Sequence, residues 1–190
     1  MKTLLVGTLS ILIGLGACAT KPQISEEEML AARTRTYEGV SSEQVMQAAE
    51  KLLKLVDESR FQFNRADTQL TATRSGELVT NIGKAEVTAV WLVKTEEKGN
   101  STVVTIEGGW HRKSISKGIS ENVKRPEGKA VYTLFWSRMD TLLGRSNEWI
   151  TCDGMQKAIE QGEASGDIRM LCAFADDKLP ESLRGKSSPS

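Results

Sequence analysis

The chain has 190 residues, with 25 basic and 25 acidic side chains, one histidine and three cysteines. This balance of charge argues against a uniformly basic nucleic-acid binder, so we expect no nucleic-acid partner. The length suffices for one hydrophobic core, and no second long apolar stretch follows the N-terminal one, so we expect nothing else to span a membrane.

Residues 1–17 have the pattern of a signal peptide. Lys2 precedes an apolar run of about 12 residues, whereas a membrane-spanning helix needs roughly 20. The run ends in Leu15-Gly16-Ala17-Cys18, which resembles the lipobox of bacterial lipoproteins. The resemblance implies that the chain is cut before Cys18, and that Cys18 carries a diacylglyceryl thioether and further acyl chains such as palmitate.

The N-terminus can be processed in two ways, with or without lipidation of Cys18. Ala17-Cys18-Ala19 also matches an ordinary secretory cleavage site, which would discard Cys18 and leave a soluble protein. With the lipobox, the membrane itself is a partner through the lipid. Because Ala19 and not aspartate follows the cysteine, the resemblance implies, in a Gram-negative host, the outer membrane with the domain facing the periplasm.

The other two cysteines are Cys152 and Cys172. In an oxidising periplasm we expect them to form a disulfide, whose loop of about 20 residues would contribute roughly 3 kcal/mol. The alternative is two unrelated buried thiols. His111 is distant in sequence and no second cysteine pair exists, so we expect no metal and no cofactor.

The first half of the mature chain predicts a helix on a sheet. Residues 18–33 form the lipidated tether, in which Ser25 and Glu28 match a capping box for a helix over 26–33; a solvated linker is the alternative. A strand follows over 34–37. Ser41 and Gln44 form a second capping box, and apolar residues recur at helical spacing over 42–56.

The middle of the chain predicts four strands. Alternating apolar and polar residues indicate strands over 61–65, 70–74, 86–95 and 101–107. The two glycines of residues 75–84 predict a loop, and Lys98-Gly99-Asn100 predicts a hairpin turn.

Residues 109–127 predict a long, mobile, basic loop. Such a loop could bind an anionic membrane surface or an acidic protein, and a merely solvated loop is the alternative. Aromatic side chains around it could act as an anchor or simply belong to the core. The predicted interaction surface comprises Trp110, His111, Arg112, Lys113, Lys117, Lys124, Arg125, Tyr132 and Trp136.

The last part predicts two helices, over 128–144 and 154–163, and a strand over 168–174. Residues 178–190 predict a disordered tail. Together the elements predict an α+β fold over 34–177, with a mainly antiparallel sheet and amphipathic helices packed on one face. Its parts are a helix-on-sheet half over 34–108, the basic loop over 109–127 and a helical half with the disulfide over 128–177.

The pattern over 34–107, a helix followed by a Phe-x-Phe strand and a threonine-rich strand, resembles the helix-grip domains of envelope lipoproteins such as BamC of the β-barrel assembly machinery. This resemblance rests on pattern and implies an interaction module; no functional residue carries over from it.

No catalytic constellation is visible. Any Ser-His-Asp or Cys-His site would need His111, and no phosphate-binding, nucleophile-elbow or zinc-protease motif occurs. We therefore expect no enzyme. The favoured hypothesis is a non-enzymatic accessory or structural subunit of an envelope complex for assembly, secretion or conjugation, with an envelope protein as partner. The alternative is a lipoprotein that binds a lipid, a glycan or a small molecule.

Overall fold

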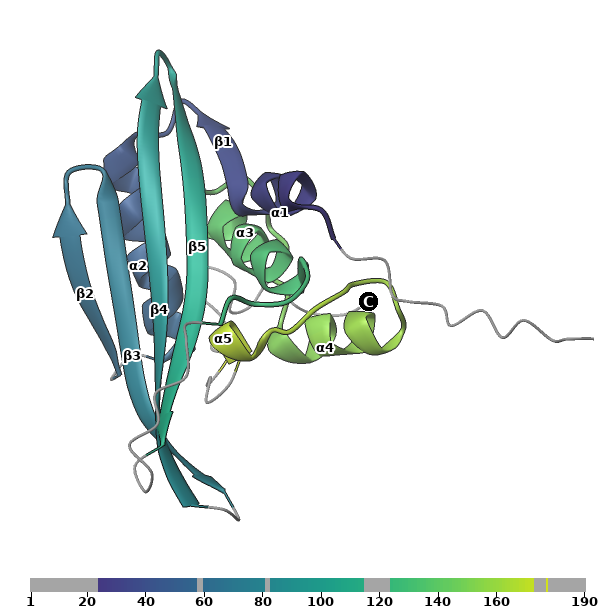
Figure 1. Cartoon of the computed structure of the whole chain (residues 1–190). Coiled ribbons are helices and arrows are strands. Elements are labelled where there is room, and N and C mark those ends of the chain that lie inside the picture. Colours follow the sequence, from purple (N-terminus) through teal and green to yellow (C-terminus); the bar gives the residue numbers. More distant parts are fainter. Residues whose placement is uncertain (1–23, 58–59, 81–82, 115–123, 173–176, 178–190) are drawn as a thin grey trace, which may run out of the picture.

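The computed structural model describes residues 24–57, 60–80, 83–114, 124–172 and 177. Their fold is α+β, as predicted. One antiparallel sheet of five strands has the order β1-β5-β4-β3-β2, and helices pack on one of its faces (Figure 1). The predicted signal peptide over 1–17, Cys18 and the predicted tail over 178–190 lie outside the described residues.

The first two helices begin where their capping boxes predict. α1 spans Glu26–Arg33 and α2 spans Ser42–Val56, and in each the serine before the helix and the third helical residue cap each other. These contacts satisfy backbone N–H groups that have no partner inside the helix. The strand β1, Thr34–Glu38, joins the two helices and pairs with β5 at one edge of the sheet.

The other strands are longer than predicted. β2 spans Phe61–Ala66, β3 Gln69–Thr80, β4 Gly83–Lys98 and β5 Ser101–Ser114. The predicted loop over 75–84 is wrong, because β3 and β4 remain paired from Gln69↔Lys94 to Thr80↔Gly83. The predicted loop over 109–127 is wrong in its first six residues, because β5 pairs with β4 as far as Ser114. Residues 115–123 lie outside the described part.

Side chains that alternate along the strands fill the space between the sheet and the helices. Leu70, Trp91, Val93 and Ile106 point from the sheet toward α2 and α3, and each is completely buried. At the centre Trp91 stacks on Phe135 of α3, with ring centroids 5.3 Å apart. The helices α2 and α3 therefore share one core on one face of the sheet.

The C-terminal part is helical. α3 spans Ala130–Leu142, α4 Cys152–Glu160 and α5 Arg169–Cys172. The predicted strand over 168–174 is wrong, since residues 169–172 form α5, whose Met170 and Leu171 are both buried. The predicted pairing of Cys152 with Cys172 is present, with Cα atoms 5.7 Å apart. It joins the start of α4 to α5.

Two glycines allow the chain to cross itself closely before α3. Gly128 pairs with Gly166, and Ser165 accepts hydrogen bonds from the backbone N–H groups of Lys129 and Ala130. A Cβ on Gly166 would lie 2.1 Å from the carbonyl oxygen of Glu127. Only glycine fits there, and the crossing ties the segment between α4 and α5 to the start of α3.

The segment assigned to the tether contributes to the domain. α1 contacts β1, α3 and β5, and its last residue, Arg33, is buried. Residues 26–33, which the sequence assigned to the tether, are therefore part of the folded domain. Among the described helices, none is both long and apolar enough to cross a membrane.

Candidate functional site

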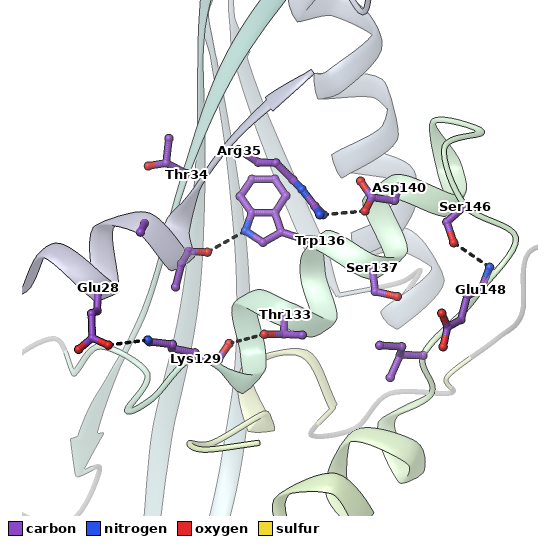
Figure 2. A pocket seen from close by; sticks show the side chains of 13 residues that line it. Glu28, Thr34, Arg35, Lys129, Thr133, Trp136, Ser137, Asp140, Ser146 and Glu148 are labelled. Atoms are coloured by element: carbon purple, nitrogen blue, oxygen red, sulfur yellow. Dashed lines mark hydrogen bonds and ion pairs between the residues drawn. The ribbon is translucent and has the colours of Figure 1, made fainter. Parts of the chain in front are cut away.

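A groove of about 620 Å³ lies between α1 and the start of β1 on one side and α3 with residues 146–150 on the other. Figure 2 shows its lining side chains, which come from segments more than 90 residues apart in sequence. Several of its polar groups are already fixed by hydrogen bonds and ion pairs.

Trp136 of α3 lies between the two sides of the groove. It is 7% exposed, and its Nε1 donates a hydrogen bond to the carbonyl oxygen of Ala32 at the end of α1, at 2.8 Å. Its ring contacts Tyr37 of β1, with centroids 6.3 Å apart, and Phe135 edge-on at 5.5 Å. Trp136 therefore holds α1 and β1 against α3.

An ion pair crosses the groove beside this tryptophan. Arg35 Nη1 donates to Asp140 Oδ2 at 2.6 Å, and the hydroxyl of Tyr37 donates to Asp140 Oδ1 at 3.0 Å. The arginine side chain is 42% exposed and the aspartate side chain 20%. Burial, and then the Asp140 carboxylate, raise the pKa of Tyr37 far above its ordinary value, so its hydroxyl stays a donor at neutral pH.

A second ion pair closes the end of the groove nearest the N-terminus. Lys129 Nζ donates to Glu28 Oε1 at 3.1 Å, which joins α1 to the residue before α3. The backbone N–H of Ser25, and then Lys129, lower the pKa of Glu28. Both side chains are exposed, so salt will screen this attraction.

The segment after α3 forms the far wall. Ser146 Oγ accepts from the backbone N–H of Glu148, and the hydroxyl of Thr141 donates to the Glu148 carbonyl oxygen. Within the described part of the chain, the Glu148 carboxylate makes no ion pair. It is exposed and lines the groove, so it is available to a cation of a binding partner.

The groove can bind but shows no catalytic arrangement in its described lining. It offers a carboxylate, hydroxyls of Thr133 and Ser137, an exposed arginine and apolar surface from Ala31 and Ile150. Neither histidine nor cysteine is among these lining residues. No group of three or more potential metal ligands occurs in the described residues either. This set of groups suits recognition of a polar chain by hydrogen bonds and ion pairs.

The residues predicted as one interaction surface do not lie on one surface. Trp110 and His111 are neighbours on β5 and so point to opposite faces of the sheet. Lys124 pairs with Trp110 through the backbone, and its Nζ lies 5.6 Å from the Trp110 ring centroid. Lys113 and Arg125 are exposed. The Arg112 side chain and Lys117 lie outside what the structure describes.

Tyr132 and Trp136 of α3 belong to the core, which is the second of the two alternatives for these aromatic side chains. Tyr132 is 1% exposed and Trp136 is 7% exposed. Trp136 also lines the groove. The cover comes from α1, which the sequence left open as either helix or linker.

No pattern in the sequence indicates that the charged residues of the groove lie close together. Arg35 and Asp140 are 105 residues apart, and neither belongs to a recognisable motif. A partial signal existed for Glu28, whose place in a capping box fixed it near the start of α1. Nothing local indicated that Lys129 would meet it.

No protein-family model matches the chain, and no curated protein matches it. Among solved structures it is similar to the crystal structure of a TBP-like protein from Parabacteroides distasonis, with 10% sequence identity and a TM-score of 0.27. The match covers 48% of this chain and 63% of that one, which is less than two thirds of its length. A likeness this distant carries no argument about function.

Proposed function

We propose that this protein is a lipoprotein of the bacterial cell envelope, anchored at Cys18, and that it acts as a non-enzymatic accessory subunit of an envelope complex. The observation that carries the proposal is the pairing of Cys152 with Cys172. Such a bridge is typical of exported proteins. The remaining cysteine of the sequence is Cys18, which ends the lipobox-like Leu15-Gly16-Ala17-Cys18.

The position of α1 limits where such a subunit can work. Seven residues lead from Cys18 to Ser25, the cap of α1. Even a fully extended chain of that length spans only about 25 Å. In a domain anchored at Cys18, the start of α1 therefore stays within about 25 Å of the anchor.

We place partner binding in the groove between α1 and α3. Its chemistry fits an extended polypeptide segment of a membrane-associated protein that carries a basic side chain for Glu148. Peptide groups of the segment would find hydroxyl partners in Thr133 and Ser137, which line the same groove. The outer membrane, facing the periplasm, remains the proposed location, on the resemblance of the lipobox followed by Ala19.

One observation favours a second candidate. A volume of about 620 Å³ lies within the range of roughly 300–1,000 Å³ that small-molecule sites occupy. A lipoprotein that binds a glycan, a lipid or another small molecule would use the same groove. The interior between α2 and the sheet is a poor alternative place for such a ligand, because fully buried Leu52, Leu53 and Trp91 fill it.

Crosslinking in living cells tests the proposal. A photoreactive amino acid replaces Thr133, which is exposed in the groove, and in a control strain it replaces Gln47, which is exposed on α2. We expect a discrete protein adduct from position 133 and none from position 47. Equal adducts from both positions would contradict a docking groove. An adduct with a non-protein molecule from position 133 alone would favour the second candidate.

The anchor has its own test. We expect Cys18→Ala to abolish palmitate labelling and membrane retention, whereas Cys152→Ser, which breaks the disulfide, should leave both intact. Palmitate labelling that persists in Cys18→Ala would refute the lipid assignment.

A further inference from the structure

The disulfide lies against a buried cation. Arg138 of α3 is 1% exposed, and its Nη2 lies 3.5 Å from Sγ of Cys152. The same guanidinium donates from Nε to the carbonyl oxygen of Ile150 at 3.1 Å and lies 5.0 Å from the ring centroid of Trp149. These contacts hold the charge of Arg138 beside one sulfur of the bridge.

Cys152 also begins a helix. It is the first residue of the nine-residue α4, whose N-cap is Thr151. The first turn of a helix carries partial positive charge from its free N–H groups. A thiolate at such a position and next to an arginine is stabilised relative to the thiol. Cys172 is the last residue of the short α5, so its sulfur does not lie at the start of a helix.

Among the described residues, the carboxylate of Asp177 opposes these positive groups. Asp177 pairs with Arg138 through Oδ1, and its Oδ2 accepts from the backbone N–H of Cys152 at 2.7 Å. It balances the buried arginine while the bridge is closed. Asp153 follows Cys152 but is exposed, so its effect on the sulfur is screened by water. Both cysteines are partly exposed, which leaves the bridge within reach of a reagent.

We propose that the Cys152–Cys172 bridge is a thiol-exchange site, at which Arg138 and the start of α4 make Cys152 the leaving thiolate when a dithiol reductant attacks Cys172. This inference is independent of the lipid anchor. Arg138 positions and stabilises the charge on Cys152, and the reductant is a protein or small molecule with two neighbouring thiols.

The exchange balances in two steps. A thiolate of the reductant bonds to Sγ of Cys172, the bond between the two cysteines breaks, and its electron pair stays on Sγ of Cys152 beside Arg138. The second thiol of the reductant then loses its proton to water and attacks the reductant's own first sulfur, which is now bonded to Sγ of Cys172. Cys172 leaves and takes up a proton, and the reductant departs as a disulfide. Two electrons pass to the protein.

A redox titration with dithiothreitol tests the proposal on the full chain. Free thiols are first blocked with N-ethylmaleimide, so that the state of Cys18 does not matter. The reduced fraction is then measured by alkylation and mass spectrometry in wild type, in Asp177→Asn and in the double variant Arg138→Met/Asp177→Asn. The double variant removes both charges and leaves no buried ion unpaired.

We expect Asp177→Asn to raise the equilibrium constant for reduction about tenfold, because the arginine is no longer neutralised, and the double variant to lower it about tenfold. In the reduced wild-type protein one thiol should ionise clearly below pH ~8.5, seen as thiolate absorbance at 240 nm. Equal reduction constants in wild type and Asp177→Asn would overturn the proposal. Asp177→Asn leaves the buried Arg138 unpaired, and if this variant does not fold the double variant decides: a reduction constant equal to that of the wild type would also overturn the proposal.

Discussion

Gly166 offers the sharpest test of how the C-terminal part is held. A Cβ there would lie 2.1 Å from the Glu127 carbonyl oxygen and 2.8 Å from Cα of Gly128, and the backbone φ is +118°. Gly166→Ala must therefore push two backbone segments apart. Three hydrogen bonds join these segments: two accepted by the Ser165 carbonyl, and one from the Asp167 N–H to Glu127.

The magnitude follows from a matched control. Gly162 also has a positive φ, +78°, but a Cβ at this residue would meet nothing within 4 Å. We expect Gly162→Ala to cost about 1–2 kcal/mol for backbone strain alone. Gly166→Ala adds the loss of three hydrogen bonds of about 0.5–1.5 kcal/mol each, for a total of about 2.5–6.5 kcal/mol.

Urea unfolding of the oxidised protein, followed by tryptophan fluorescence, measures both changes. For a domain of this size, the loss in Gly166→Ala corresponds to a melting temperature lower by roughly 5–26 °C. If the two alanine variants lose the same free energy of unfolding, the close crossing contributes nothing to stability and the reasoning is refuted.

Three further predictions use the same assay. Ser41→Ala removes the capping box of α2 and should cost about 1 kcal/mol; an unchanged unfolding midpoint would contradict a stabilising cap. Trp136→Phe loses the bond to Ala32 and leaves a cavity where the larger indole packed, so we expect a loss of at least about 1 kcal/mol, which a neutral result would refute. Because the pKa of Tyr37 is raised on folding, the unfolded tyrosine ionises first, and stability falls as pH rises above about 10 by up to ~1.4 kcal/mol per unit. Tyr37→Phe should show a shallower fall, and an identical slope would exclude this cause.

The predictions were correct for those elements that are determined by residues close together in the sequence. The capping serines Ser25 and Ser41 fixed the starts of α1 and α2, and helical spacing of apolar residues fixed the length of α2. The predictions were wrong where contacts with residues distant in the sequence determine the secondary structure. Gly76 suggests a loop, yet it stays in β3 because β4 pairs with it across the hairpin at Val87.

The same limit applies to α5 and to the groove. Ile168, Met170 and Cys172 alternate as in a strand, but Met170 packs on Gly108 and Cys172 bonds to Cys152, and both contacts are distant in sequence. Arg35 and Asp140 meet only after the sheet and α3 have assembled. A pattern of a few residues carries no information on contacts between distant residues, so the groove could not be predicted. The disulfide could be predicted because it follows from the number of cysteines.

The place of β1 has a mechanical consequence. It is a strand of five residues at the edge of the sheet, and together with α1 it comes first in the domain. In a protein held at Cys18, any tension from the membrane reaches α1 and β1 before the rest, while the disulfide near the other end of the chain bears none of it. These two elements supply Ala32 and Arg35 to the groove. Force on the N-terminus would thus detach α1 and β1, one wall of the groove, before the core unfolds. A bound partner that contacts both walls would stabilise these two elements against that force.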